Sequence, residues 1–585
     1  MRTLAPVRTV AELWRTAVTE PRDYPAYLVE EGGEWREVSW AQAGRRAGEL
    51  AAGFLALGAG KGDRVAILAR TRLEWTLCDF ALVSIGAVPV PIYPTSSGPE
   101  CAYIVENSAA RLLVLEDAGQ EEKLAPHLSG LPALEQISTM AAEGEAATPL
   151  ADLAARGVAL LAEHPSAVDD ARAAVGEEDM LTIVYTSGTT GPPKGCVLLH
   201  RNYWVMVDMV DQVPDFWRER DVAVLFLPLA HVFGRLVELG CARRGITIAF
   251  CPDPASVGPA VAAVRPTILP SVPRVYEKVH AGVTASFAKA TGAKRRLIDW
   301  ALGVGYRASE CRERRHPYPP LLALQHALAD RLVFAKVRAR LGGRLRLPLS
   351  GGAPLGTDVC AFFHALGIPI LEGYGLTECG TAATLNYPGR FRIGTVGLPF
   401  NGQEVKIAED GEILIRGENV FAGYWRDEPA TRAVLTEDGW LRSGDVGSID
   451  EDGFLTITDR KRDIIITAGG KNISPQNIEN ALKAAPLVSQ ALVIGDRRPY
   501  VTALVTVDPA EAAKFAPEAV RGAVERTVAS VNETLGRTEQ IKRFALLPRD
   551  FSPEMGEVTP TLKLRRRVCE ENFRAEIESL YEETA

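Results

Sequence analysis

A segment rich in glycine and hydroxyl groups, TIVYTSGTTGPPKGC (182–196), has the composition of a loop that binds phosphate. Glycine adopts backbone angles that other residues avoid, so successive amides can turn toward one anion. Lys194 adds a mobile positive charge, but Gly195 follows it where a Walker A loop has Ser or Thr. The alternative is a plain turn between a strand and a helix. The candidate phosphate donors are Thr186, Ser187, Gly188, Thr189, Thr190 and Gly191.

The stretch EGYGLTECG (372–380) places a tyrosine and a carboxylate close together. We expect an exposed face of Tyr374 to stack on a purine ring. Glu378 is a candidate ligand for Mg²⁺ that bridges phosphate groups. The alternative for Glu378 is an acid that favours the start of a helix.

Three later stretches add charged residues near turns. LRSGDVG (441–447) is expected to hold Asp445 in a tight turn, where its carboxylate accepts both hydroxyl groups of a ribose. DRKRDIIITAGGKNISP (459–475) has charged residues before a strand and a Gly-Gly turn, and GEVTPTLKLRRR (556–567) offers Lys563. Taken singly, Asp445 also suits an ordinary turn, and Lys563 suits a solvated basic tail.

Length and composition restrict the class of protein. A chain of 585 residues exceeds one hydrophobic core, so several subdomains are expected. Its 47% hydrophobic and 24% charged residues are ordinary for a globular protein, and a net charge of −9 disfavours nucleic acid as a partner. Nine cysteines without a CxxC pair disfavour a zinc site or a disulfide framework. Together with the lack of an apolar signal core near the first residue, they predict a cytoplasmic location.

Short apolar runs alternate with amphipathic segments, such as the helix predicted at 41–58, before about residue 394. This pattern predicts an α/β fold with a large domain of several subdomains and mainly parallel sheets. Beyond residue 394, Asp-Gly turns between alternating segments predict a small antiparallel β subdomain, and after residue 463 a mixed α+β unit follows. The apolar runs predicted as strands of these sheets are 64–69, 87–93, 111–116, 181–186, 222–229, 245–250 and 267–272.

One predicted helical segment, about 278–343, differs in charge from the rest of the chain. From Lys278 to Arg340 it has thirteen Lys or Arg and four Asp or Glu, and HPYPP (316–320) interrupts it. It is either a solvated helical hairpin or a patch for anionic membrane lipid or another anionic ligand. The longest apolar run, 80–94, is short and broken by proline, which predicts a buried helix end and a strand and not a membrane span.

The order of these motifs along nearly the whole chain resembles the adenylate-forming superfamily of acyl-CoA synthetases, adenylation domains and luciferases. YTSGTTGPPKG, GYGLTE, SGD, DRxxD and TPTxK follow one another as they do in that superfamily. The segment between VPRVYEK and LPLSGGAPL, with GGKNISP and TPTLK, looks most like the bacterial long-chain fatty acyl-CoA ligases. The resemblance implies an AMP-binding domain at 1–461 with the basic insertion at about 278–343, and a mobile C-terminal domain at 462–585.

The resemblance also implies roles for individual residues. The loop from Thr186 to Lys194 would bind the β- and γ-phosphates of ATP, and Glu378, with Thr186, would hold Mg²⁺. Thr377 would reach the α-phosphate, and Lys563 would bridge the fatty carboxylate and that phosphate. The nucleoside would contact Gly352, Ala353, Pro354, Glu372, Gly373, Tyr374, Asp445 and Arg460, of which the last two hold the ribose.

A second set of positions is implied for acyl transfer to coenzyme A. His231 would line the acyl and pantetheine path, although a lone histidine is also common as a structural residue. Arg462 would be the hinge of the mobile domain, and Gly469, Gly470 and Lys471 would face the CoA thiol.

The implied reaction turns a fatty acid, ATP and CoA into acyl-CoA, AMP and pyrophosphate through an acyl-AMP. The attack brings an anion onto a polyanion, so charge neutralisation and alignment carry the catalysis. The alternatives are a fatty acyl-AMP ligase that loads a carrier protein, and a non-enzymatic nucleotide-binding scaffold at a membrane. The acyl chain length, the oligomeric state and peripheral contact with the inner face of a membrane stay open.

Overall fold

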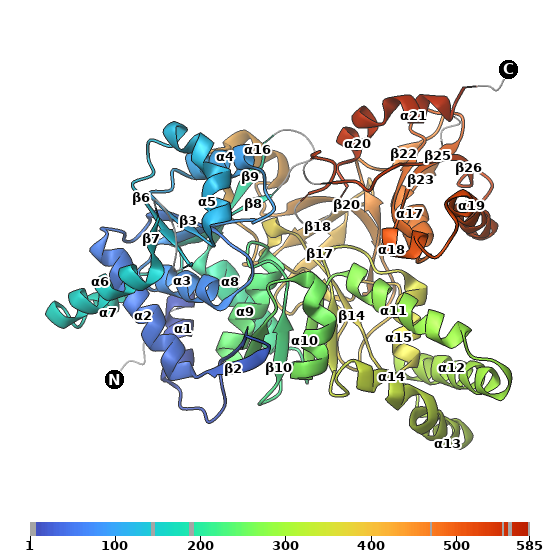
Figure 1. Cartoon of the computed structure of the whole chain (residues 1–585), viewed down its shortest axis with the longest axis horizontal. Helices are drawn as coiled ribbons and strands as arrows, with labels where there is room; N and C mark the ends of the chain where they lie inside the picture. Colours follow the sequence, from blue (N-terminus) through green and yellow to red (C-terminus); the bar gives the residue numbers. More distant parts are fainter. Residues whose placement is uncertain are drawn as a thin grey trace.

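The computed structural model describes residues 8–141, 147–186, 192–468, 471–552, 555–559 and 564–582. Figure 1 shows a large body of helices and sheets and, in orange and red, a smaller group of elements from the end of the chain. The predicted α/β fold with a small α+β unit after residue 463 is confirmed by this architecture.

The largest sheet has nine strands, and its central neighbours are parallel. The buried strands consist mainly of apolar residues, as a parallel sheet covered on both faces requires. The predicted strands between residues 222 and 272 are confirmed here. The order is β16 (Leu398–Pro399), β15 (Thr384–Leu385), β14 (Leu371–Tyr374), β13 (Leu347–Ser350), β12 (Ile268–Ser271), β10 (Val222–Leu225), β11 (Thr247–Phe250), β1 (Tyr27–Glu31) and β2 (Glu34–Val38).

A second sheet has five parallel strands and contains the other predicted runs of the first 120 residues. The run 80–94 is the end of helix α3 (Leu73–Ser84) followed by a strand, as predicted. No helix among the described residues is long and apolar enough to cross a membrane. The strand order is β4 (Val88–Ile92), β3 (Arg64–Leu68), β5 (Leu112–Leu115), β6 (Gln136–Thr139) and β7 (Thr148–Pro149).

Two antiparallel sheets complete the large body. The first is the predicted antiparallel subdomain, which is confirmed. Its strand order is β17 (Glu404–Ile407), β18 (Glu412–Arg416), β20 (Leu441–Ile449) and β21 (Leu455–Arg460). The second sheet has three strands in the order β19 (Gly423–Tyr424), β9 (Lys194–Leu199) and β8 (Met180–Thr186). The predicted strand at 181–186 is confirmed as β8, but it lies outside the parallel sheets, because it pairs with the antiparallel β9 that directly follows the glycine-rich loop.

The final part of the chain has its own mixed sheet, β24 (Val488–Ile494), β25 (Val501–Val507) and β26 (Ile541–Leu546). Before it, β22 (Ile465–Ile466) and β23 (Asn472–Ile473) form a small hairpin. A separate hydrophobic cluster lies between this sheet and two helices, α17 and α19. The helices here are α17 (Pro475–Lys483), α18 (Pro509–Ala512), α19 (Pro517–Thr534), α20 (Arg566–Asn572) and α21 (Arg574–Ser579).

The basic segment is helical and broken as predicted. Its helices are α11 (Pro273–Ala288), α12 (Gly292–Glu313), α13 (Pro320–Ala329) and α14 (Ala335–Arg340), with a π-helical turn at Asp330–Phe334 between the last two. Figure 1 shows α12 and α13 projecting at the lower right, with α13 below α12. α12 packs against α15 (Thr357–Ala365), and a side chain at Gly305 would collide with the carbonyl oxygen of Ala365.

The remaining helices cover the sheets of the large body. The predicted helix at 41–58 is confirmed as α2, which begins at a capping box of Ser39 and Gln42. The others are α1 (Val10–Thr19), α2 (Trp40–Ala56), α4 (Gly98–Ser108), α5 (Ala118–Leu124), α6 (Leu150–Glu163), α7 (Ala167–Ala173), α8 (His200–Asp211), α9 (Val232–Arg244), α10 (Val257–Val264) and α16 (Glu428–Val434).

A fully buried ion pair joins α3 to α9. The Arg235 guanidinium donates to both carboxylate oxygens of Asp79 at 2.7 and 2.9 Å, and both side chains are 0% exposed. Glu238 lies in the same cluster, where burial raises its pKa to about 8. Such a pair holds two elements in one arrangement, and losing one partner leaves a buried charge uncompensated.

We predict that Asp79→Ala lowers the free energy of unfolding by about 3–5 kcal/mol, because Arg235 loses its counter-charge in the core. Urea unfolding followed by far-UV circular dichroism measures this loss. The control is Glu428→Ala, which removes an exposed partner of Arg432 and should cost less than about 1 kcal/mol. Equal losses in the two variants would contradict the structural role of the buried pair.

Candidate active site

The predicted phosphate loop connects the paired ends of β8 and β9. Thr186 and Lys194 stand opposite each other in the antiparallel ladder, and the Thr186 hydroxyl lies 3.4 Å from the Lys194 carbonyl oxygen. The loop therefore joins two strands of a hairpin and not a strand and a helix. Ser187, Gly188, Thr189, Thr190 and Gly191 lie outside the described residues.

Lys194 is held loosely at the start of β9. Its ammonium nitrogen lies 5.2 Å from the ring centre of Tyr424, in the geometry of a cation–π contact, and 3.9 Å from the Asp427 carboxylate. The side chain is 43% exposed, so its charge is screened by water and only weakly neutralised by one distant acid. Lys194 thus keeps a positive charge that can turn toward a phosphate.

Tyr424 connects this lysine to the acidic residue of the GYGLTE motif. Its hydroxyl donates a hydrogen bond of 2.8 Å to Glu378 Oε1. Burial raises the pKa of Tyr424, so its hydroxyl stays protonated and acts as the donor. The sequence analysis did not identify Tyr424 or Asp427, because neither lies in the motifs that it singled out. The available signal was the run GYWRDE (423–428), which joins two aromatic residues to three charged ones.

Glu378 has the properties of a magnesium ligand. It lies in a short 3₁₀ turn (Thr377–Cys379), is half-buried, and forms no ion pair within the described residues. Its second carboxylate oxygen has no partner there. Mg²⁺ in nucleotide sites commonly binds one or two carboxylates plus substrate phosphates, so a single free carboxylate near a phosphate loop fits. No cluster of three or more potential ligands exists among the described residues.

A hydrogen bond from Tyr374 to Asp445 links two sheets at the candidate nucleoside site. Tyr374 ends β14, and its hydroxyl donates to Asp445 Oδ2 at 2.7 Å, while Arg460 Nε lies 3.3 Å from Asp445 Oδ1. The expectation of an exposed tyrosine face is wrong, since Tyr374 is only 8% exposed beneath neighbouring residues. The predicted tight turn at Asp445 is also wrong. The residue lies within β20, next to Gly444 at a φ of 73° and opposite Arg460 of β21.

The loop after β13 places Gly352, Ala353 and Pro354 at the surface, and Gly352 has a φ of 82° that favours glycine. Behind this loop, the amide of Leu355 donates to Glu372 Oε2 at 3.3 Å. Burial raises the pKa of Glu372 to about 7. Glu372 therefore holds the end of this loop through its hydrogen bond with the Leu355 amide. Gly373 lies in β14 between Glu372 and Tyr374.

His231 caps the N-terminus of α9. Its Nδ1 accepts a hydrogen bond of 3.1 Å from the Phe233 amide, which leaves the imidazole half-buried at the helix end. The adjacent Val232 carbonyl accepts from the Thr381 hydroxyl at 3.2 Å. Thr381 follows the GYGLTE turn, so this bond ties the start of α9 to the segment that carries Thr377 and Glu378.

The residues predicted for coenzyme A are only partly described. Arg462 and Lys471 are exposed, on either side of the hairpin strand β22. Gly469, Gly470 and Lys563 lie outside the described residues. The terminal unit contacts the large body near this region, where Ser474 donates to Asp459 at 2.6 Å and Arg565 lies 3.8 Å from Glu100 on α4.

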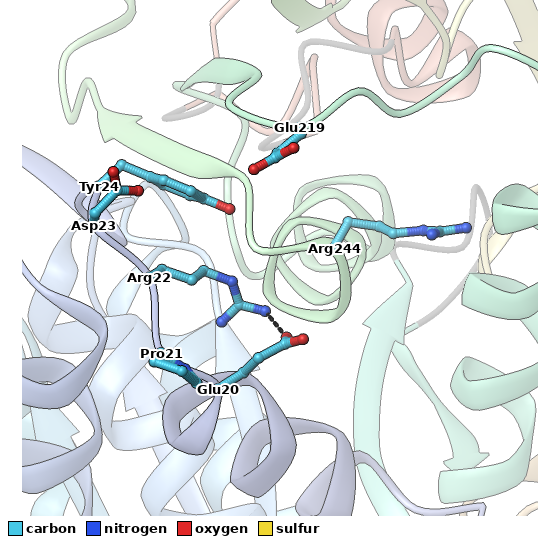
Figure 2. A pocket seen from close by; sticks show the side chains of 7 residues that line it. All are labelled: Glu20, Pro21, Arg22, Asp23, Tyr24, Glu219 and Arg244. Carbon is cyan, nitrogen blue, oxygen red and sulfur yellow. Dashed lines mark hydrogen bonds and ion pairs between the residues drawn. The ribbon is translucent and has the colours of Figure 1, made fainter.

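A surface pocket elsewhere is lined by charged residues but is not part of this site. Figure 2 shows Arg22 directed at Glu20, with Tyr24, Asp23, Glu219 and Arg244 around it. The Arg22 guanidinium already lies over the Trp40 ring and donates to the Ala17 carbonyl oxygen. Asp23 and Arg244 are paired with Arg220 and Asp211, so we assign the pocket no ligand.

Comparison with known proteins matches residues 13–425 to the AMP-binding enzyme family and residues 462–585 to the AMP-binding enzyme C-terminal domain. The long-chain-fatty-acid–CoA ligase FadD15 of Mycobacterium bovis is 39% identical over 96% of this chain and 95% of its own length. The long-chain-fatty-acid–CoA ligase ACSBG2 of Xenopus laevis is 32% identical over 99% and 84%, respectively. The adenylation domain of a carboxylate reductase from Mycobacterium chelonae has the same fold, with a TM-score of 0.77 and 22% identity over 99% of this chain and 92% of that chain.

We predict that Tyr374→Phe weakens nucleotide binding about 3- to 10-fold, because Asp445 loses the hydroxyl that orients it. Isothermal titration with ATP measures the affinity. The matched control is Tyr500→Phe, which removes a hydroxyl that donates to a backbone carbonyl in the terminal unit. An affinity that falls equally in both variants, or in neither, would argue against a nucleoside site at Asp445.

Proposed function

Because the chain belongs to the AMP-binding enzyme family, we propose that it is a ligase that joins long-chain fatty acids to coenzyme A at the expense of ATP. The observation that carries this proposal is the chain of contacts from Lys194 through Tyr424 to Glu378. It places a weakly paired cation and a carboxylate oxygen without a partner in the described part of the chain beside one glycine-rich loop, as binding of a metal-bound polyphosphate requires.

The first half-reaction forms an acyl-AMP. A carboxylate oxygen of the fatty acid attacks the α-phosphorus of ATP, and the bond from that phosphorus to pyrophosphate breaks. We assign phosphate binding to Thr186, Lys194 and the loop between them, and contact with the α-phosphate to Thr377. Asp445 and Arg460 would hold the ribose, supported by Tyr374.

Magnesium is proposed at Glu378, with the hydroxyl of Thr186 as a second candidate ligand. When bound, Mg²⁺ neutralises phosphate charge and orients the polyphosphate. The free carboxylate oxygen of Glu378, and the bond from Tyr424 that fixes the other oxygen, support this position.

The second half-reaction transfers the acyl group to coenzyme A. The thiolate attacks the acyl carbon, and the bond to AMP breaks. We propose that a mobile domain, 462–585, turns about Arg462 and brings Gly469, Gly470 and Lys471 to the thiol, while 1–461 holds the adenylate. His231, at the start of α9, would line the path of the acyl group and pantetheine. A closing domain also keeps water from the adenylate.

Two other functions are less well supported. A fatty acyl-AMP ligase would need no coenzyme A, whereas the relatives described above carry CoA ligase names over nearly their whole length. A non-enzymatic scaffold would not need Lys194, Glu378, Asp445 and Arg460 in one arrangement.

ATP–pyrophosphate exchange and acyl-CoA formation, measured over acids of different length, test the proposal. We expect exchange with long-chain acids without coenzyme A, and thioester formation when it is added. Exchange without any thioester would favour the carrier-loading alternative, and no exchange with any acid would favour the scaffold.

We predict that Lys563→Ala lowers acyl-AMP formation about 10²-fold or more, which is the cost of removing one donor that stabilises an oxyanion in the transition state. Thioester formation from supplied acyl-AMP should change little. Lys471→Ala is the matched control, since its loss should have the opposite effect on the two half-reactions. Stopped-flow or quenched assays measure the rate of each half-reaction separately. Equal losses of rate in both half-reactions of Lys563→Ala would refute the assignment of Lys563.

A further inference from the structure

Helix α13 and the π-helical turn that follows it carry a row of leucines on their outer face. Leu321, Leu324, Leu328 and Leu332 are 67%, 70%, 50% and 36% exposed, at spacings of three and four residues that place them on one side. We call these four residues the leucine face. Nine large hydrophobic side chains are exposed within the described residues, and four of them form this one row. An apolar row of this kind on a surface helix marks a contact site.

The leucine face is not needed to hold the helix in place. The opposite side of the same segment is buried against the body by Leu322, Ala329, Val333, Phe334 and Val337. α13 is also fixed to α12 by a hydrogen bond of 3.1 Å from Arg307 to Gln325. The folded segment therefore presents its leucines on a support that is already packed.

Positive charge surrounds this row. Arg331 lies within it, Lys336 and Arg340 continue the exposed side of the same helical segment, and all three are exposed. None of them forms an ion pair with a residue that the structure describes. From Pro320 to Arg340 the charged residues are four Lys or Arg and one Asp, in a chain whose net charge is −9. Exposed leucines next to unpaired cations are the pattern of a helix that lies in the headgroup layer of an anionic membrane.

We infer that α13 lies in the interfacial layer of an anionic phospholipid bilayer, with the leucine face among the acyl chains and Arg331, Lys336 and Arg340 among the headgroups. The inference deepens the proposed function and rests on it for its purpose, since a long-chain fatty acid partitions into membranes. Charge favours lipid over a second copy of the chain, because two positively charged faces repel each other.

Co-sedimentation of the full chain with vesicles tests the inference. The probes are vesicles of phosphatidylcholine alone and of phosphatidylcholine with phosphatidylglycerol, at low and at high salt. Wild type should bind the anionic vesicles more strongly, and high salt should weaken this binding without abolishing it, because only the charge contribution is screened.

Three variants separate the contributions. Leu324→Ser/Leu328→Ser should lower the partition coefficient about tenfold or more at both salt concentrations, since two half-exposed apolar side chains no longer enter the bilayer. Lys336→Gln/Arg340→Gln should lower it at low salt only. Val158→Ser, which removes a 51% exposed apolar side chain from α6, is the matched control and should bind as wild type does.

Equal binding by the leucine variant, the control and wild type would overturn the inference. So would a wild-type dimer in analytical ultracentrifugation that the leucine substitutions dissociate while vesicle binding persists, because the leucine face would then contact a second copy. The readout does not depend on catalysis, so a failed ligase assay with intact vesicle binding would count against the proposed function alone.

Discussion

The hydrogen bond from Tyr374 to Asp445 is the constraint on which the candidate site depends. It joins the carboxyl end of β14, in the nine-stranded sheet, to β20 in the antiparallel sheet. Tyr424 makes the equivalent link from the three-stranded sheet to Glu378. Polar groups on separate sheets keep a fixed spacing only when such bonds orient them, and a nucleotide that spans several sheets requires that spacing. The site is therefore a junction of sheets and not a cleft within one of them.

The same junction determines how far the two cations of the site, Lys194 and Arg460, are neutralised by neighbouring acids. A fatty carboxylate must approach a polyphosphate, so the protein needs cations that are not already neutralised. Lys194 meets this need because the Tyr424 ring attracts its charge without carrying a negative charge of its own, and the nearest acid, Asp427, lies 3.9 Å away. Arg460 is different, since it shares Asp445 with the hydroxyl of Tyr374. One cation remains free to move, and the other stays with the acid it orients.

The sequence was sufficient for features that depend on local chemistry. Each of the seven predicted apolar runs contains a strand, and the glycine, hydroxyl and charged motifs singled out Lys194 and Glu378, which both contact Tyr424. It was not sufficient where a partner distant in the chain decides the outcome. Tyr374 is buried where its hydroxyl reaches Asp445 of β20, and β8 is antiparallel because β9 returns beside it. The Asp79–Arg235 pair joins residues 156 positions apart, and neither residue has a local signal.

The basic segment shows the same limit in a different way. From residue 320 to 334 it is apolar on nearly every side of the helix, so its sequence does not distinguish the leucines that pack from those that remain exposed. The distinction arises because α12 covers only one side of α13. α12 in turn lies against α15, which connects β13 and β14 and so leads directly to the loop of Gly352 and to Tyr374. A membrane contact at α13 would thus be separated from the nucleotide junction by only two packed helices, which is a short distance for a substrate that enters from lipid.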